Sequence, residues 1–523
     1  MNSPGVDPRA PCIIGVGQHT WRPESAEFAA PEPLAMWEDV ARAAAADTGE
    51  STVLSMLDSV QIVYCQSWQY DDPVGRLSAR IGAAPRHRLY SGIGGTTPQV
   101  LVNKTAEAML VGEFDLALIT GAEALDTLRR AKKRGERLAW SFKDPEKKPF
   151  PFEAPFHPAE VAHEVFQAWL TFAVFDVARR AHLGTEPQAH RERLGRLLTP
   201  MTEIAAANPH AWFPTARSAE ELITPTASNR MVGYPYTKYM VSVMDVDMAA
   251  ALIVATHQRA DELGIPTDRR VYLRSWAYAE DPHYVAERDE MWRSPAMART
   301  SSAVLEGGGV TIDDVGHLDL YSCFASSVLF ARDVLGISDD DARSMTVTGG
   351  LPFAGGAGSD YVTHSIAAMT DRLRTDPGSF GLVSGVGMHM TKHVYALYSS
   401  TPGPVAPPDD AIARDVSAAP RQPIVDTYAG EAKVAAYSVA HGRDGDAQWG
   451  LAVCDLPAGG RAYAKILDPG LLTDAEGREL VGSAVELVPG EGNANLVRRL
   501  LGNRRAQIGE PFGAARKAAS PQP

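Results

Sequence analysis

Two stretches of this chain share one pattern, and that repeat limits the possible folds more than any other feature. Residues 33–65 and 294–323 each contain an alanine-rich helical segment, a short loop, an acidic position and an alternating apolar segment that ends in tyrosine and cysteine. Equivalent methionines lie 261 residues apart and equivalent cysteines 258 apart, so the offset is almost constant across helix and strand. We therefore expect a unit that occurs twice.

A pair of glycines precedes a helix and a buried strand in both halves. Gly94 and Gly95 lead through a helical segment to the apolar run at 115–124, and a second glycine pair at 349–350 leads through another helix to 381–387. Strands that alternate with helices predict a parallel sheet with helices on both faces. The sequence thus predicts an α/β protein with two βαβ-rich halves, residues 9–255 and 260–400.

Other segments differ from this pattern. A long polar and proline-rich stretch predicts a lid or binding insertion over about 126–245, inside the first half. Residues 401–424 are rich in proline and predict a linker. Short alternating runs over 425–502 predict a small antiparallel β-barrel of the OB type, and residues 503–523 predict a flexible tail.

Charge, hydropathy and cysteine content exclude several classes of protein. A net charge of −14 and a pI near 5.5 argue against nucleic-acid binding. No apolar run is long enough to span a membrane and the N-terminus lacks a signal-peptide pattern, so we expect a cytoplasmic protein without a membrane partner. The four cysteines (Cys12, Cys65, Cys323, Cys454) form no CxxC pair, which predicts reduced thiols and no metal site.

Glycine-rich and histidine-rich motifs give only weak signals. GVGQHT and GIGGTT do not complete GxGxxG before a helix with an acidic residue about 20 positions later. His157 and His163 do not have HExxH spacing, so a zinc hydrolase is not supported. We therefore expect no bound cofactor.

The start of the helix after Gly95 is the place where chemistry is expected. Thr96 and Thr97 are typical capping residues, and Pro98 fits the first helical turn. Gly112 is expected to end this helix. Backbone N–H groups at such a helix start form a natural site for an anion or an oxyanion.

The order of these landmarks resembles the thiolase family. The motif IIGVGQ, the triplet Gly121-Ala122-Glu123 at a strand end and the segment VDMAAALIV carry the resemblance, which covers about residues 10–400. With its added barrel, the chain resembles the actinobacterial thiolase-like proteins of type 1, which are similar to acetyl-CoA acetyltransferases. The resemblance implies a duplicated, layered α/β/α/β/α fold, a role in lipid metabolism and a coenzyme A thioester as substrate or ligand.

The catalytic residues of thiolases are replaced at the matching positions. The resemblance puts the nucleophilic cysteine, 17 residues before Gly112, at Gly95, the histidine at Gly356 and the second cysteine at Val383. Thiolysis needs a thiolate that accepts the acyl group, so we expect classical thiolase activity to be absent. The substrate-binding residues that the resemblance implies are Gly94, Gly95, Thr96, Gly355, Gly356, Ser384 and Gly385.

Three residues remain as candidates for catalysis. Tyr321 and Cys323 end a predicted strand at the expected rim of the site, and His393 lies in MHMTKH. Cys323 is either a displaced nucleophile or a buried apolar residue. His364, His389 and His393 are each either a general base or a structural residue.

Three functions stay open. The favoured one is an acyl-CoA-binding, thiolase-like protein of the acyltransferase superfamily without classical thiolase activity. The second is a retro-aldolase that cleaves a 3-hydroxyacyl-CoA of the steroid side-chain type, with Tyr321, Tyr234, Tyr236 or Tyr239 transferring the proton and the barrel replacing a separate OB-fold partner. The third is a non-catalytic acyl-CoA binder, and the oligomeric state stays open between homodimer and monomer.

Overall fold

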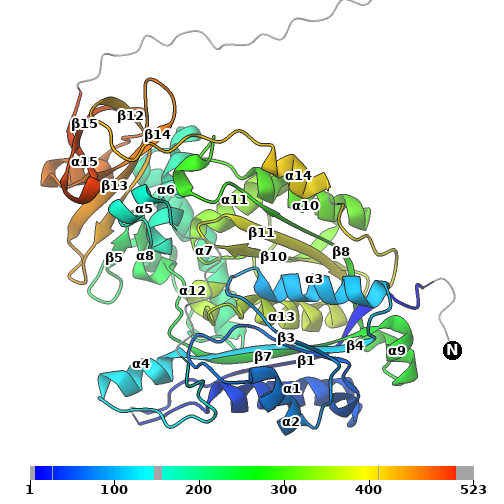
Figure 1. The fold of residues 1–523 in the computed structure, drawn as a ribbon. Helices are drawn as coiled ribbons and strands as arrows, with labels where there is room; N and C mark the ends of the chain where they lie inside the picture. The colour runs from blue at the N-terminus through cyan, green and yellow to red at the C-terminus, as the bar shows by residue number, and fades with distance from the viewer. Residues whose placement is uncertain (1–5, 26, 147–155, 410, 502–523) are drawn as a thin grey trace, which may run out of the picture.

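The computed structural model describes residues 6–25, 27–146, 156–409 and 411–501, and the predicted tail at 503–523 lies outside them. A nine-stranded sheet runs through the core and bends into two halves that face each other (Figure 1). In spatial order its strands are β3 (His87–Tyr90), β2 (Ser59–Ile62), β4 (Leu116–Ala124), β7 (Asp247–Thr256), β1 (Pro11–Thr20), β8 (Val271–Glu280), β11 (Lys392–Ser399), β10 (Phe380–Gly387) and β9 (Val315–Asp319).

Helices form the three remaining layers. Between the two sheet halves lie α3 (Thr97–Leu110) and α13 (Tyr361–Thr375), which contact strands of both (Figure 1). The outer layers contain α1 (Pro33–Thr48) and α2 (Pro73–Ile81) on one side, and α10 (Pro295–Gly308), α11 (Ala325–Leu335) and α14 (Ala411–Ser417) on the other, while α9 (His257–Glu262) packs at the edge. The order α1–β2 recurs as α10–β9, so the predicted duplicated α/β/α/β/α fold is confirmed.

The direction of strand pairing corrects one expectation. β2 pairs in parallel with β3 and β4, and β9 pairs in parallel with β10. All pairs that involve β7 or β11 are antiparallel, so the prediction of a parallel sheet was wrong for them. Only residues 388–391 join β10 to β11, and a loop of that length allows a hairpin but no crossover helix.

The insertion between β4 and β7 is mostly helical. It contains α4 (Leu125–Lys133), α5 (Pro158–Ala162), α6 (Ala168–His182), α7 (Pro187–Ala207), α8 (Ala219–Ile223) and two short strands, β5 (Met231–Gly233) and β6 (Tyr236–Thr237). α6 contacts α11 of the core and a strand of the C-terminal barrel, so the insertion connects these two parts. In the described part of the chain, no helix has the length and apolar character needed to cross a bilayer.

The C-terminal strands form a closed five-stranded barrel (Figure 1). They are β12 (Gly430–His441), β13 (Ala447–Asp455), β14 (Arg461–Ile466), β15 (Ala484–Pro489) and β16 (Asn495–Leu500), with α15 (Pro469–Gly477) between β14 and β15. β12 closes the barrel by pairing with β13, and all pairs are antiparallel except the single β14–β16 bridge. The small barrel expected after the linker is thus confirmed, whereas its boundaries at 425–502 stay a prediction.

Candidate functional site

Segments that are far apart in the sequence converge on the N-terminus of α3. The backbone N–H of Gly94 donates to the hydroxyl of Ser359 at 3.0 Å, which joins the first glycine pair to the loop before α13. A Cβ atom added to Gly385 of β10 would lie 3.2 Å from the carbonyl oxygen of Gly95. Most of the binding residues that the resemblance implied therefore lie around one helix tip.

Tyr321 occupies the space next to Gly95 where a nucleophilic side chain would lie. A Cβ atom added to Gly95 would collide with the hydroxyl of Tyr321 and with the carbonyl oxygen of Val386. Tyr321 is 6% exposed, and burial raises its pKa well above 10, so the phenol is protonated at neutral pH. Its backbone N–H donates to the hydroxyl of Ser384 at 2.9 Å, which fixes the backbone of Tyr321 against β10.

The expectation that the side chain of Thr96 caps α3 was wrong. It takes the N-cap position of α3, but its backbone is in the α-helical region and its side chain makes no capping hydrogen bond. A capping side chain normally needs an extended backbone at this position. The hydroxyl of Thr96 instead lies near Gly387, because a Cβ atom added there would be 3.5 Å from it.

Cys323 does not have the environment of a nucleophile. Its thiol is buried and lies 3.9 Å from the hydroxyl of Ser327. Burial raises the pKa of the thiol to about 12, so almost no thiolate forms at neutral pH. The structure does not bring His393 to this thiol.

His393 lies in a buried polar network below the start of α10. Its Nε2 atom is 3.1 Å from the carboxylate of Asp281 and 3.2 Å from the hydroxyl of Ser294, the N-cap residue of α10. Burial opposes the ionisation of Asp281, but Arg288 and His393 outweigh it and lower the pKa of Asp281 to about 2. The His393 side chain therefore stabilises the connection between β8 and α10, although its backbone pairs with Val386 of β10.

The two other candidate histidines, His364 and His389, are buried as well. Nδ1 of His364 lies 3.2 Å from the side-chain oxygen of Gln18, and burial lowers the pKa of His364 to about 3. Nδ1 of His389 lies 2.9 Å from the hydroxyl of Thr171, and burial lowers the pKa of His389 to about 4. Both rings are thus held by other elements, and the structure places neither in contact with Gly95.

The remaining positions that the resemblance singled out contain no reactive group. The N–H of Gly356 donates to the carbonyl of Val243 at 2.8 Å, and a Cβ atom added to Gly356 would lie 2.6 Å from the hydroxyl of Ser242. Val383 is fully buried within β10, opposite Asp319 of β9. Besides Gly385, β10 places the carbonyl of Val386 against Gly95; the sequence reasoning missed Val386, although it lies between two glycines at the strand end.

A pair of buried carboxylates lies behind the helix tip. Glu123 accepts hydrogen bonds from the N–H groups of Gln66 and Ser67 at 2.7 and 2.9 Å, and burial raises its pKa to about 7. Asp360 follows Ser359, and its pKa is raised by burial and by the charge of Glu123. The sequence marked Glu123 as a strand-end residue, but no local signal identified Asp360 as its neighbour.

An elongated groove opens beside the Gly355–Gly356 loop. Its larger part, a cavity of about 580 Å³, and an adjoining cavity of about 430 Å³ share Arg217 and Tyr239. The guanidinium of Arg217 lies 3.9 Å above the Tyr239 ring. We call this feature the Arg217 groove; its larger part is lined by Pro23, Asp126, Arg129, Trp212, Phe213, Arg217, Lys238, Tyr239, Val243, Asp245, Pro352 and Phe353.

The Arg217 groove combines aromatic rings with cations. Arg129 is paired with Asp126 and Asp245. Within the part of the chain that the structure describes, Arg217 and Lys238 form no ion pair, so both cations are available to an anionic ligand. Trp212 brings the groove wall to the Gly355–Gly356 loop, because a Cβ atom added to Gly355 would lie 3.1 Å from the Cβ atom of Trp212.

Among solved structures, the chain is similar to thiolase-like proteins. No family model matches the chain. A solved monomeric SCP2-thiolase like protein type 1 from Mycobacterium smegmatis is 32% identical, with a TM-score of 0.81 over 94% of this chain and 99% of that one. The Ltp2-ChsH2(DUF35) aldolase has the same fold at 17% identity, with a TM-score of 0.56 over 75% of this chain and 98% of that one.

Curated relatives match over a shorter stretch. A 3-ketoacyl-CoA thiolase of Citrobacter koseri is 32% identical over 157 residues, which are 26% of this chain. The chain thus spans about a third of the length of the curated relatives that it matches, namely 33% of this thiolase.

Proposed function

This chain belongs to the thiolase superfamily, with an SCP2-thiolase-like protein of type 1 as a full-length relative, and from that premise we propose that it binds an acyl-CoA thioester without using the acyl-cysteine chemistry of thiolases. The contact between Gly95 and Tyr321 carries this proposal. Acyl transfer through an enzyme thiol needs a sulfur atom at the helix tip. At this tip the glycine has no side chain, and the adjacent space contains a phenol.

The Arg217 groove is the proposed site for the nucleotide part of coenzyme A. Phosphates need cations, which Arg217 and Lys238 would supply, and adenine stacks on aromatic rings such as those that line the groove. The thioester would then point past Gly355 and Gly356 towards Gly94, Gly95 and Thr96. Ser384 and Gly385 would form the opposite wall.

Binding and acylation are separable in one experiment. Titration calorimetry should detect acetyl-CoA binding, and the intact mass after incubation with acetyl-CoA or a 3-ketoacyl-CoA should show no acyl adduct. An acyl group on Cys323 or on another thiol would refute the proposal.

The groove has its own test. Arg217→Ala should weaken acyl-CoA binding about tenfold, because a hydrogen bond to a charged group contributes about 1.5 kcal/mol or more. Arg196→Ala is the matched control, since Arg196 is exposed on α7 outside the groove. Equal affinities for the two variants would remove the groove from the proposal.

Retro-aldol cleavage of a 3-hydroxyacyl-CoA is the second candidate, and the protonated phenol of Tyr321 favours it. In this reaction a base removes the hydroxyl proton, the Cα–Cβ bond breaks, and an acid such as the phenol returns a proton to the enolate carbon. The other candidate tyrosines lie elsewhere: Tyr234 contacts Arg180, Tyr236 donates to Asp176, and Tyr239 packs under Arg217.

Product analysis distinguishes the two functions. Release of a carbonyl product from a 3-hydroxyacyl-CoA, together with the shortened acyl-CoA, would support the aldolase, and Tyr321→Phe should then reduce kcat at least 100-fold. Tyr395→Phe is the matched control, because it removes a buried hydroxyl that has no hydrogen-bond partner among the described residues. Binding without turnover of any of these thioesters would support the non-catalytic binder.

A further inference from the structure

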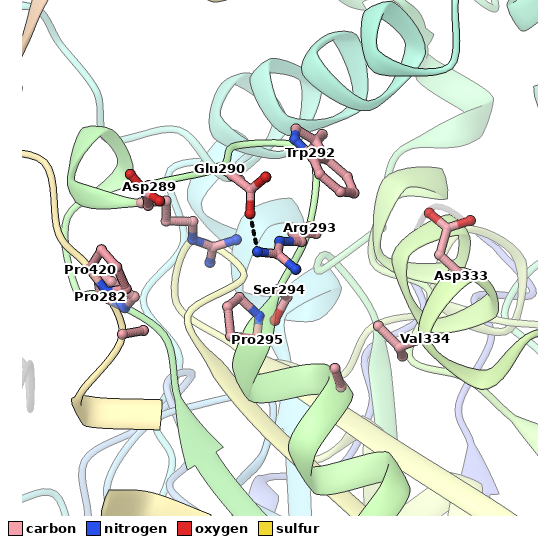
Figure 2. Close-up of a pocket in the computed structure, with 13 residues that line it drawn as sticks. Pro282, Asp289, Glu290, Trp292, Arg293, Ser294, Pro295, Asp333, Val334 and Pro420 are labelled. Atoms are coloured by element: carbon pink, nitrogen blue, oxygen red, sulfur yellow. Dashed lines mark ion pairs between the residues drawn. The ribbon is translucent and has the colours of Figure 1, made fainter. Parts of the chain in front are cut away.

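A second cavity, separate from the Arg217 groove, lies in the outer helical layer (Figure 2). It has a volume of about 490 Å³ and is bounded by the segment between β8 and α10, the end of α11 and the linker before the barrel. Its lining shares no residue with the Arg217 groove. The lining residues are Pro282, Arg288, Asp289, Glu290, Trp292, Arg293, Ser294, Pro295, Ala298, Asp333, Val334, Ala419 and Pro420.

Most of the cavity wall is apolar. Pro295 of α10 and Val334 of α11 line it, and Pro282 and Pro420 lie on the opposite side (Figure 2). Ala298 of α10 also belongs to the lining. The remaining large apolar group is Trp292, whose ring is stacked on His182 with centroids 3.6 Å apart and is thereby held in place. A space of this size and character suits the apolar body of a small organic molecule.

The carboxylates of the wall already have partners. Glu290 forms an ion pair with Arg293 (Figure 2). Asp333 accepts two hydrogen bonds from the buried guanidinium of Arg179, one of them at 2.7 Å. Asp289 accepts one from the side chain of Gln422 at 2.6 Å. These acidic groups therefore do not call for a cationic ligand.

Arg288 is the charged group of the lining whose hydrogen bonds are incomplete. It is 2% exposed, and its Nη2 atom donates to the carbonyl oxygens of His389 and Met390. Nε and Nη1 have no hydrogen-bond partner within the described residues. A buried guanidinium with unmatched N–H groups is costly, and a carboxylate is the small group that matches them best.

Asp281 does not supply the missing partner. Its carboxylate is 3.7 Å from Nη2 of Arg288, beyond hydrogen-bonding distance. The same carboxylate already accepts from the N–H of Ala296 at 3.0 Å and from the hydroxyl of Ser294, and it lies 3.1 Å from His393. Among the described residues, the donors on Nε and Nη1 thus remain without an acceptor, while the guanidinium lies 4.1 Å from the centre of the Phe175 ring.

We propose that this cavity binds an organic monocarboxylate with an apolar body, with its carboxylate directed to Arg288 and its body against Trp292, Ala298 and Val334. A straight chain of about ten carbon atoms is compatible with a pocket of this volume. The site is independent of the acyl-CoA site proposed above.

Calorimetric titration of the full chain with decanoate and with 1-decanol tests the charge requirement. Decanoate should bind at least tenfold more tightly than the alcohol, since both have the same apolar body and only the acid can pair with a guanidinium. Equal affinities, or no binding of decanoate, would overturn the proposal.

Variants locate the bound acid. Ala298→Phe fills the cavity without touching the Arg288 network and should reduce decanoate affinity at least tenfold, whereas Ser302→Phe, one turn further along α10, should not. Arg288→Gln should abolish the preference for decanoate over 1-decanol, but it leaves Asp281 without its guanidinium and risks unfolding, so the Ala298 variant is the primary test. Arg217→Ala should leave decanoate binding unchanged. Unchanged affinity in Ala298→Phe, or loss of affinity in Arg217→Ala, would place decanoate elsewhere and refute the site.

Discussion

At the scale of single residues, burial controls the ionisation of the groups behind the helix tip. Glu123 and Asp360 are both buried, burial raises the pKa of each, and the charge of Glu123 raises the pKa of Asp360 further. Ser359 precedes Asp360 in the chain, and its hydroxyl accepts a hydrogen bond from the N–H of Gly94. One hydrogen bond therefore connects the segment that contains Asp360 to the glycines at the start of α3. The pair therefore links the protonation of the interior to the site.

Glu123 should make stability depend on pH. Its pKa is raised from 4.5 to about 7 in the fold, so its contribution is fully present below pH 4.5 and is lost as the pH rises through 7. Between pH 4.5 and 7.5, the unfolding free energy of the wild type should fall by about 3 kcal/mol through the ionisation of Glu123, and Glu123→Gln should not show this fall. Urea denaturation at both pH values measures this, and identical pH slopes for variant and wild type would contradict the expectation.

At the scale of elements, the close approach of α3 to β10 and to the loop after β9 explains the glycine at its start. Tyr321 and the Val386 carbonyl come so near to Gly95 that no side chain fits between them. The helix itself follows from local sequence, since it begins with Pro98 in its first turn and is followed by Gly112 in the left-handed region at a φ of 82°. Which chemical groups lie at the start of α3 is decided by the segments that pack against it, namely those of Tyr321 and Val386.

Restoring the cysteine should therefore destabilise the protein without restoring activity. Gly95→Cys should lower the unfolding free energy by about 1–3 kcal/mol through overpacking, and adding Tyr321→Ala should recover part of that loss. Thermal denaturation measures both effects. Gly477→Cys is the control, because a Cβ atom there would lie more than 4 Å from its neighbours in the described part of the chain. Wild-type stability of Gly95→Cys would show that Tyr321 leaves room for a side chain.

At the scale of the whole molecule, a buried arginine attaches the barrel to the insertion between β4 and β7. Arg180 of α6 is fully buried and donates to the hydroxyls of Tyr234 and Tyr437 at 2.7 and 2.9 Å. It also pairs with Glu479 of the barrel at 2.8 Å. β5 of the insertion extends the barrel sheet through β12, so insertion and barrel form one folded layer.

Removing that attachment should separate the unfolding of the two parts. Arg180→Met should cost about 3 kcal/mol, because it breaks a buried network. Calorimetry should then resolve two transitions where the wild type shows one, and limited proteolysis should cleave faster within residues 401–424. Arg498→Ala, on an exposed face of the barrel, is the control. A single unshifted transition in Arg180→Met would show that the barrel is held by other contacts.

The sequence by itself determined the duplicated halves, the layered α/β architecture, the added small barrel and the glycine at the tip of α3. The two halves and the barrel follow from the repeat, the periodicity and the turn residues along the chain. The layering and the glycine at the helix tip were expected from the resemblance to the thiolase family. Tertiary structure alone decided the antiparallel pairing of β7 and β11, the placement of Tyr321 against Gly95 and the position of His393 below α10. It also produced the Arg217 groove and the cavity beside Arg288, because the segments that line each of them are far apart in the sequence and no local pattern predicts that they come together.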